Sequence, residues 1–251
     1  MAGILRYEWR RITTIRSTWI LLGLAVIFSI GFSWLAMAGL KSATSTPDSG
    51  LAPNDLLITE IVGQVVVANF IVLVLFATVA AQAFGQEYRN GTIRVTLTAF
   101  PKRLPVVLGK VIVCLGLLTA VFAVCVAAPY LLLSSSDVVN SDISVSTMLG
   151  FFLRSWLYFC GYMLVVIALT LITRILALAV IIPLLMAVVF ENLASALGSR
   201  WLPWIDNVLP FASGSRFVAG GEDLLRNGLV FGAWVLVLSV VGVVLFQKRD
   251  A

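Results

Sequence analysis

The chain has 251 residues, of which 61% are hydrophobic and 12% are charged, whereas an average soluble domain has about 25% charged residues. This composition excludes an ordinary soluble domain. The net charge of +5 does not indicate nucleic-acid binding, because the basic residues lie between apolar runs, where orientation in a membrane accounts for them. The sequence contains no histidine, which excludes zinc-protease motifs, Ser-His dyads and imidazole proton relays.

Six apolar runs are each long enough to cross a hydrocarbon layer, which takes about 20 helical residues. The sequence therefore predicts an all-α, polytopic integral membrane protein with six transmembrane helices, located in a bacterial plasma membrane and surrounded by lipid. The helices are expected at residues 18–40, 61–84, 106–133, 150–172, 175–197 and 228–246. Thr173 and Arg174 alone separate the fourth and fifth runs, which predicts a tight helical hairpin. Pro183 is expected to kink the fifth helix.

Lysine and arginine are distributed unevenly between the two sides of this topology. Most of the 17 lie on the side that holds the N-terminus. The others are Lys41, Arg154, Arg200, Arg216 and Arg226. Because basic residues are concentrated in cytoplasmic loops, we expect the N-terminus, the 85–105 loop and the 247–251 tail in the cytoplasm.

Residues 1–17 carry apolar residues at helical spacing with basic residues beside them. The apolar residues are Leu5, Trp9 and Ile12, and the flanking ones are Arg6, Arg10 and Arg11. This pattern suits an amphipathic helix that lies in the cytoplasmic membrane interface. The alternative is a basic flank that only sets the orientation of the first span.

The segment 199–227, expected on the outer side, is too rich in tryptophan, leucine and phenylalanine for a free loop. Short helices that dip back toward the membrane would cover these side chains, while tryptophans anchor at the interface. Interfacial packing without any role in a substrate path fits the sequence equally well.

The largest loop expected in the cytoplasm has clear turn and helix-end signals. Asn90-Gly91 is a turn signal, and Thr92 can cap a following helix. Ile93, Leu97 and Phe100 would form one apolar face of a short helix that Pro101 ends. The alternation from Ile93 to Ala99 also fits a strand, but the sequence shows no partner strand, so a helix is favoured.

This loop carries a resemblance. The stretch EYRNGTIRVTLTAFPKR at 87–103, followed by Lys110, resembles the E-x-x-x-G-T…R…K segment of type-2 ABC transporter permeases, the ABC-2 family. The six-span layout and the basic N-terminus are similar too. In that family the segment is a coupling helix that docks on a separate ATP-hydrolysing subunit. The resemblance implies ATPase-coupling roles, with charges at the rim of the docking surface, for Glu87, Tyr88, Arg89, Gly91, Thr92, Arg94, Leu97 and Arg103. The alternative is a basic cytoplasmic loop with a turn.

The chain carries no sign of its own energy source. Gly109-Lys110-Val111 lacks the upstream glycine and the Ser/Thr of a phosphate-binding loop. We therefore expect no enzyme activity, catalytic residue, metal site or cofactor in this chain, with ATP and Mg on a partner subunit. Glu60, Arg154, Arg174 and Glu191 lie close to predicted helix ends, so no ion relay through the membrane is evident.

The second span carries a line of polar residues, namely Glu60, Gln64, Thr78 and Gln82. At 100° per residue these side chains fall near one line of a helix. The line could border a substrate path, or it could hydrogen-bond a neighbouring helix or a dimer partner. Asn69 lies off this line and needs a partner of its own.

Two functions from different classes remain open at this stage. The first is the permease subunit of an ATP-driven ABC exporter, working as a homodimer or heterodimer with ATP-binding subunits. Replacing Glu87 with arginine is then expected to uncouple ATP hydrolysis from transport. The second is a membrane scaffold or immunity-type protein that binds a partner without transport. A secondary transporter ranks below both, because the sequence shows neither buried charge nor an internal repeat. Drugs, peptides and lipids are all compatible as substrates.

Overall fold

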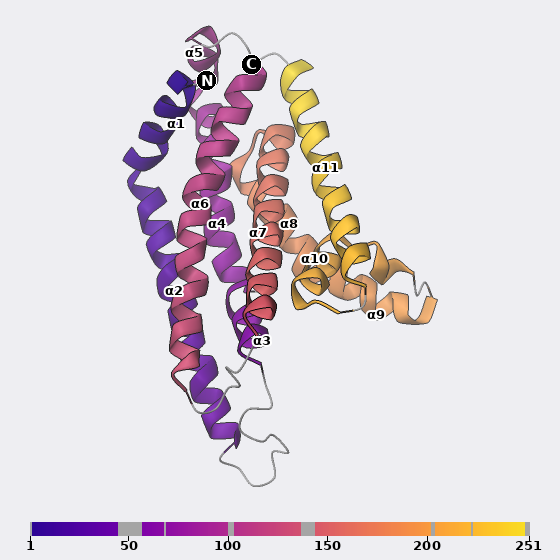
Figure 1. The fold of residues 1–251 in the computed structure, drawn as a ribbon. Helices are drawn as coiled ribbons and strands as arrows, with labels where there is room; N and C mark the ends of the chain where they lie inside the picture. The colour runs from indigo at the N-terminus through magenta and orange to yellow at the C-terminus, as the bar shows by residue number, and fades with distance from the viewer. Residues whose placement is uncertain are drawn as a thin grey trace.

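The computed structural model describes residues 2–44, 57–67, 69–99, 103–136, 144–201, 204–221 and 223–248. Nearly all of these residues are helical, and none of them forms a strand (Figure 1). In chain order the elements are α1 (Ala2–Thr14), α2 (Arg16–Thr44), α3 (Ile58–Val62), the π-helical η1 (Gly63–Val67), α4 (Phe70–Asn90), α5 (Ile93–Ala99), α6 (Arg103–Ser134), α7 (Val145–Thr173), α8 (Leu176–Leu185), the π-helical η2 (Met186–Phe190), α9 (Glu191–Trp201), the 3-10 helix η3 (Ile205–Asn207), α10 (Pro210–Ala219) and α11 (Leu224–Lys248).

Six of the described helices are long and apolar enough to cross a membrane, which confirms the predicted fold class. They cover Arg16–Ala43, Phe70–Asn90, Arg103–Ser134, Val145–Thr173, Leu176–Ala196 and Leu224–Lys248. An even number of spans brings both ends of the chain to one end of the bundle, as Figure 1 shows. That this end faces the cytoplasm stays a prediction from the distribution of basic residues.

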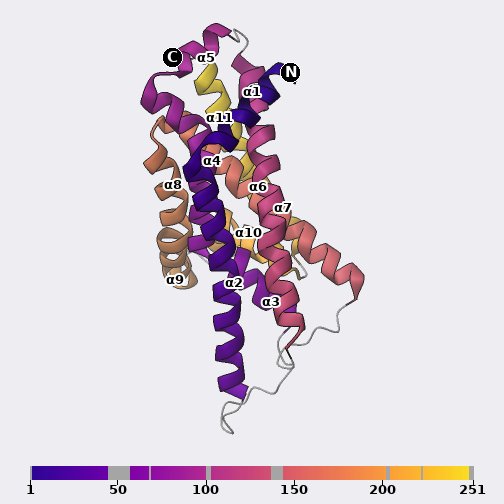
Figure 2. The same ribbon diagram turned by 90° about the vertical axis from the view of Figure 1, so that its left-hand side faces the viewer.

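The helix α7 packs against two groups of helices. On one side α2, α4 and α6 pack together, and on the other α10 and α11 pack against α7 (Figures 1 and 2). Phe122 stacks on Phe159 with ring centroids 4.2 Å apart, and Phe76 meets Phe159 edge-on at 5.0 Å. Gly242 lets α11 approach α7 closely, since a Cβ there would lie 3.0 Å from the carbonyl oxygen of Ala168.

The run predicted as a single helix at 61–84 is divided. Its first part lies in α3 and η1, and the spanning helix α4 starts only at Phe70. The side chain of Asn69 caps α4 by accepting hydrogen bonds from the backbone N–H groups of Ile71 at 3.0 Å and Val72 at 3.4 Å. The break has a physical reason, because asparagine satisfies the free N–H groups of a first turn better than it fits a helix interior. The cap also supplies the partner that Asn69 needed.

The tight hairpin between the fourth and fifth spans is confirmed. α7 ends at Thr173, and Arg174 adopts a left-handed conformation with φ of 59°. Its N–H donates to the carbonyl of Thr170 at 2.9 Å, and α8 starts at Leu176. The fifth span departs from α-helical geometry at Met186–Phe190, directly after the turn that contains Pro183.

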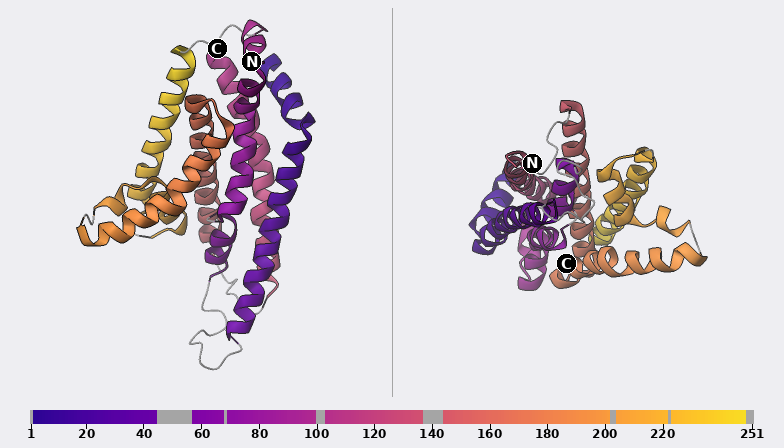
Figure 3. Two further views of the ribbon diagram at one scale, coloured as in Figure 1. Left: turned by 180° about the vertical axis from the view of Figure 1, so that it is seen from behind. Right: turned by 90° about the horizontal axis from the view of Figure 1, so that it is seen from below.

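Between α9 and α11, the described part of the 199–227 segment contains two short helices, η3 and α10. α10 packs against the spanning helices α7 and α11 (Figure 3). Its side chains Phe211 and Val218 are buried. The buried carboxylate of Glu191 holds its first turn by accepting hydrogen bonds from the N–H groups of Phe211 at 2.8 Å and Ala212 at 2.5 Å. Entry of this segment into the lipid layer stays a prediction.

Glu191→Ala is expected to lower the thermal stability of the purified protein. It leaves two N–H groups of the first turn of α10 without their acceptor, and a buried polar group left unpaired costs about 1–3 kcal/mol. Glu191→Gln keeps one acceptor oxygen, so its melting temperature should lie between those of Glu191→Ala and the unaltered protein. Thermal unfolding in detergent measures the effect, with exposed Leu193→Ala as the neighbouring control. Equal melting temperatures for Glu191→Ala and the control would show that the cap contributes little.

Candidate functional site

The end of the bundle that carries the chain termini also brings together α1, α5, the last turns of α4 and the first turns of α6 (Figures 1 and 2). α1 packs closely along α6, where Ile4 lies against Gly109. A Cβ at position 109 would lie 2.5 Å from Ile4 Cγ2, so only glycine permits this approach. The amphipathic N-terminal helix is therefore part of the folded bundle.

Four charged side chains form a cluster where these helices meet: Glu8, Arg11, Glu87 and Lys110. Lys110 Nζ lies 2.7 Å from Glu8 Oε1 and 2.7 Å from Glu87 Oε1. Arg11 forms an ion pair with Glu87 and lies 3.2 Å from Glu8 Oε2. The guanidinium of Arg11 also donates to the carbonyl of Ala83. Each cation thus touches both carboxylates, and the cluster has no net charge.

The cluster is buried. Glu8, Glu87 and Lys110 are exposed by 3%, 4% and 1%, and the Arg11 side chain by 19%. Lys110 Nζ also lies 5.5 Å from the centre of the Phe84 ring, within the range of a cation–π contact. Taking charges out of water costs several kcal/mol each unless they are paired. The four groups therefore depend on one another and tie α1, α4 and α6 into one unit.

The buried face of α1 differs from the predicted one. The structure buries Ile4, Glu8 and Ile12, which recur every four residues. In the predicted stripe only Ile12 is fully buried, while Trp9 is 50% exposed. Glu8 contacts two cations inside the bundle, Arg11 and Lys110, and the buried face of α1 is therefore the one that carries Ile4, Glu8 and Ile12. An exposed Trp9 suits a membrane interface, so the interfacial role of α1 stays a prediction.

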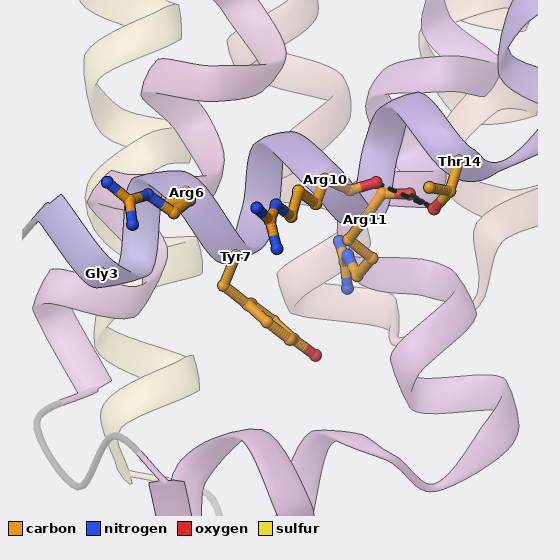
Figure 4. Close-up of a pocket in the computed structure, with 6 residues that line it drawn as sticks. All are labelled: Gly3, Arg6, Tyr7, Arg10, Arg11 and Thr14. Carbon is orange, nitrogen blue, oxygen red and sulfur yellow. Dashed lines mark hydrogen bonds between the residues drawn. The ribbon is translucent and has the colours of Figure 1, made fainter.

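The opposite side of α1 carries a shallow basic groove of about 450 Å³. It is lined by Gly3, Arg6, Tyr7, Arg10, Arg11 and Thr14 (Figure 4). Thr14 donates to the carbonyl of Arg10 at 2.8 Å, so its hydroxyl is used within the helix. Arg11 belongs to both the groove and the buried cluster, and it therefore links the exposed face of α1 to the interior.

A comparison with protein-family models decides the family. The model of the ABC-2 family transporter protein matches residues 4–191. The chain belongs to the ABC-2 family of transporter membrane proteins. The matched part contains all four residues of the buried cluster and the whole 87–103 segment. Among curated proteins the comparison finds no match. The resemblance seen in the sequence is thus confirmed, and the protein is a membrane transport component.

In this ABC-2 protein the 87–103 segment contains the expected short helix, α5. Gly91 ends α4 with φ of 67°, a conformation that favours glycine. The carbonyl of Thr92 accepts the first hydrogen bond of α5 from the N–H of Thr96 at 3.1 Å. Ile93 is buried, whereas the described residues of the segment that are exposed are Arg89, Asn90, Gly91, Thr92, Arg94, Val95, Thr98 and Ala99. Phe100, Pro101, Lys102 and the side chain of Leu97 lie outside the described residues.

The predicted coupling residues separate into two groups. Arg89, Gly91, Thr92 and Arg94 lie on the surface of the ABC-2 protein. Glu87 is buried in the charge cluster and does not lie on the exposed surface of the segment. Its coupling role stays a prediction. The Arg174 guanidinium lies over the Tyr88 ring, with its Cζ 5.4 Å from the ring centre. Arg103 Nη1 donates to the carbonyls of Phe246 at 3.1 Å and Gln247 at 3.0 Å, which ties α6 to the end of α11.

The polar line on the second span is not continuous, because the helix breaks between Gln64 and Thr78. Glu60 and Gln64 are exposed on a cavity at the end away from the termini. Thr78 donates to its own helix at the carbonyl of Val74, 2.8 Å away. Gln82 Oε1 accepts from the hydroxyl of Ser17 on α2 at 3.3 Å. Half of the line thus meets a cavity, and the other half serves helix contacts.

Proposed function

We propose that this ABC-2 protein is the permease subunit of an ATP-driven export system, paired with separate ATP-binding subunits and with a second permease copy. The family assignment and the six apolar helices support a permease. ABC-2 family permeases generally pair with ATP-binding subunits. ATP and Mg would be held by that partner, since this sequence lacks a phosphate-binding loop. The export direction is inferred from the resemblance described above.

The position of the charge cluster next to α5 is the observation that supports a role in coupling. α4 ends at Asn90 and α5 begins at Ile93, so only Gly91 and Thr92 connect the two helices. Glu87 lies one turn before this junction and is held by Arg11 of α1 and Lys110 of α6. A partner that moves α5 would therefore pull on three helices at once. Buried ion pairs favour discrete arrangements over gradual deformation, which suits a switch between two states.

The arginines beside α5 provide the test of docking. Arg89→Glu together with Arg94→Glu is expected to weaken retention of the ATP-binding subunit by about tenfold or more, because reversed charges at an interface rim repel the partner. Co-purification in mild detergent, followed by an ATPase assay of the eluate, measures the loss. Both residues are exposed, so the fold should stay intact.

Lys41→Glu is the matched control, since it reverses an exposed charge at the far end of α2. It should retain the partner fully. A non-transporting scaffold predicts that no ATPase co-purifies with either variant or with the unaltered chain. Full retention in the Arg89 and Arg94 double variant would contradict docking at α5.

A further inference from the structure

A cavity of about 680 Å³ lies at the end of the bundle away from the termini, between α3 with η1, α7 and α10. Its volume falls within the range of small-molecule sites, about 300–1,000 Å³. The cavity is removed from the charge cluster and from α5, and nothing in the coupling proposal uses it. Under the predicted orientation it opens on the outer half of the membrane.

The cavity wall combines apolar surface with charges of both signs. Leu57, Ile61 and Phe151 supply apolar side chains, while Glu60, Arg154 and Arg216 supply one negative and two positive charges. A charge near hydrocarbon is costly, and ionisable residues that face a cavity in a membrane bundle commonly mark a substrate or ion pathway. Three charged residues on one cavity therefore indicate a ligand with charged groups and an apolar part.

Arg154 is positioned for an anion. Its Nε donates to the carbonyl of Val218 in the last turn of α10 at 3.3 Å, and its guanidinium lies beside Gly150 and Gly220. A guanidinium carries five N–H donors, and among the described residues Val218 supplies its only acceptor. One bond thus fixes the side chain and leaves the paired N–H groups that bind carboxylate or phosphate in a fork.

Glu60 lies on the same cavity with an exposed side chain. No lysine or arginine of the described segments forms an ion pair with its carboxylate. The two arginines on α7 and α10 and the carboxylate on α3 thus come from three separate elements, and all three residues line this cavity. A single ligand with an acidic and a cationic group could engage both.

We infer that this cavity binds a zwitterionic amphiphile, with its acidic group on Arg154 and Arg216, its ammonium on Glu60 and its apolar body against Leu57, Ile61 and Phe151. The inference rests on the proposed function in one respect, since it names the substrate class of the permease. Binding itself requires neither ATP nor a partner subunit. The site can therefore be tested in the isolated chain.

Native mass spectrometry of the delipidated protein in detergent gives the test, with two probes. Lysophosphatidylethanolamine carries phosphate and ammonium, and lysophosphatidylglycerol carries phosphate alone. The unaltered protein is expected to prefer the first. Arg154→Gln and Arg216→Gln should each weaken both probes by about tenfold or more, the effect of losing a charge-assisted hydrogen bond. Glu60→Gln should remove the preference and leave lysophosphatidylglycerol unchanged.

Arg226→Gln is the matched control, because it neutralises an exposed arginine on α11 that does not line the cavity. Arg154→Lys and a melting curve for each variant guard against misfolding, and Glu60→Gln removes no hydrogen bond within the described structure. Unchanged binding in the Arg154→Gln, Arg216→Gln double variant would overturn the inference, as would an equal loss in Arg226→Gln. If coupling failed in the ATPase assay of the co-purified subunit, these binding results would not change, so the two proposals can be contradicted separately.

Discussion

Replacing Lys110 with methionine is expected to lower the free energy of unfolding by about 3–5 kcal/mol, the usual effect of removing one partner from a buried ion pair. Lys110 is 1% exposed and contacts both carboxylates of the cluster. Without it, Arg11 faces Glu8 and Glu87 alone, and one buried negative charge is left unbalanced. Methionine fills a similar volume, so the effect reports charge rather than packing.

Unfolding in mixed micelles of a mild detergent and dodecyl sulfate measures the change. Lys248→Met is the matched control at the same end of the bundle, because Lys248 is exposed in the last turn of α11. Its stability should be unchanged. A Lys110→Met protein as stable as this control would mean that the four charges do not depend on one another.

Glu87→Arg would report on the stability of the fold rather than on coupling. Three buried cations would then face the single carboxylate of Glu8, so most of the protein is expected to misfold. Loss of transport in that variant would follow from loss of fold and would say nothing about coupling. A test of coupling needs a substitution that keeps the buried charge balanced.

The transmembrane helices could be predicted from the sequence because each depends on a local property. An apolar run of about 20 residues has no stable place outside a membrane or a core. The hairpin at Arg174 and the short helix α5 were also local, since turn residues and spacing determine them. The break at Asn69 was a local signal too, but the continuous apolar run around it concealed the cap.

The charge cluster depends on contacts between residues far apart in the sequence. Glu8 and Lys110 lie 102 residues apart and Arg11 and Glu87 lie 76 apart, so no periodicity connects them. One signal was present: Phe76, Ala80, Ala83 and Glu87 recur on one buried face of α4. A carboxylate on such a face requires a cation, and Lys110 in an apolar run requires an anion. The pairing of Glu87 with Lys110 could have been proposed because each requires an opposite charge. The participation of Glu8 and Arg11 from α1 could not.

Coupling is expected to fail in the double variant Glu87→Gln, Lys110→Met. It removes one charge of each sign, so Glu8 and Arg11 remain as a balanced pair at 3.2 Å within α1. We expect this protein to recover part of the stability lost in Lys110→Met. α5 and its exposed arginines are unchanged, so the ATP-binding subunit should still be retained. The ionic link from the end of α4 to α1 and α6 is gone, and ATPase activity per retained subunit should lose its dependence on the permease.

Reconstituted proteoliposomes provide the measurement, with ATPase activity normalised to the amount of ATP-binding subunit. Asp223→Asn with Lys248→Met is the matched control, because it also removes one charge of each sign but from exposed positions. Two double variants thereby separate docking from transmission. The Arg89→Glu, Arg94→Glu protein should lose the ATP-binding subunit. The Glu87→Gln, Lys110→Met protein should retain this subunit but no longer stimulate its ATPase activity. Normal stimulation in the neutralised protein would show that α5 transmits its movement through the backbone of α4 without the charge cluster.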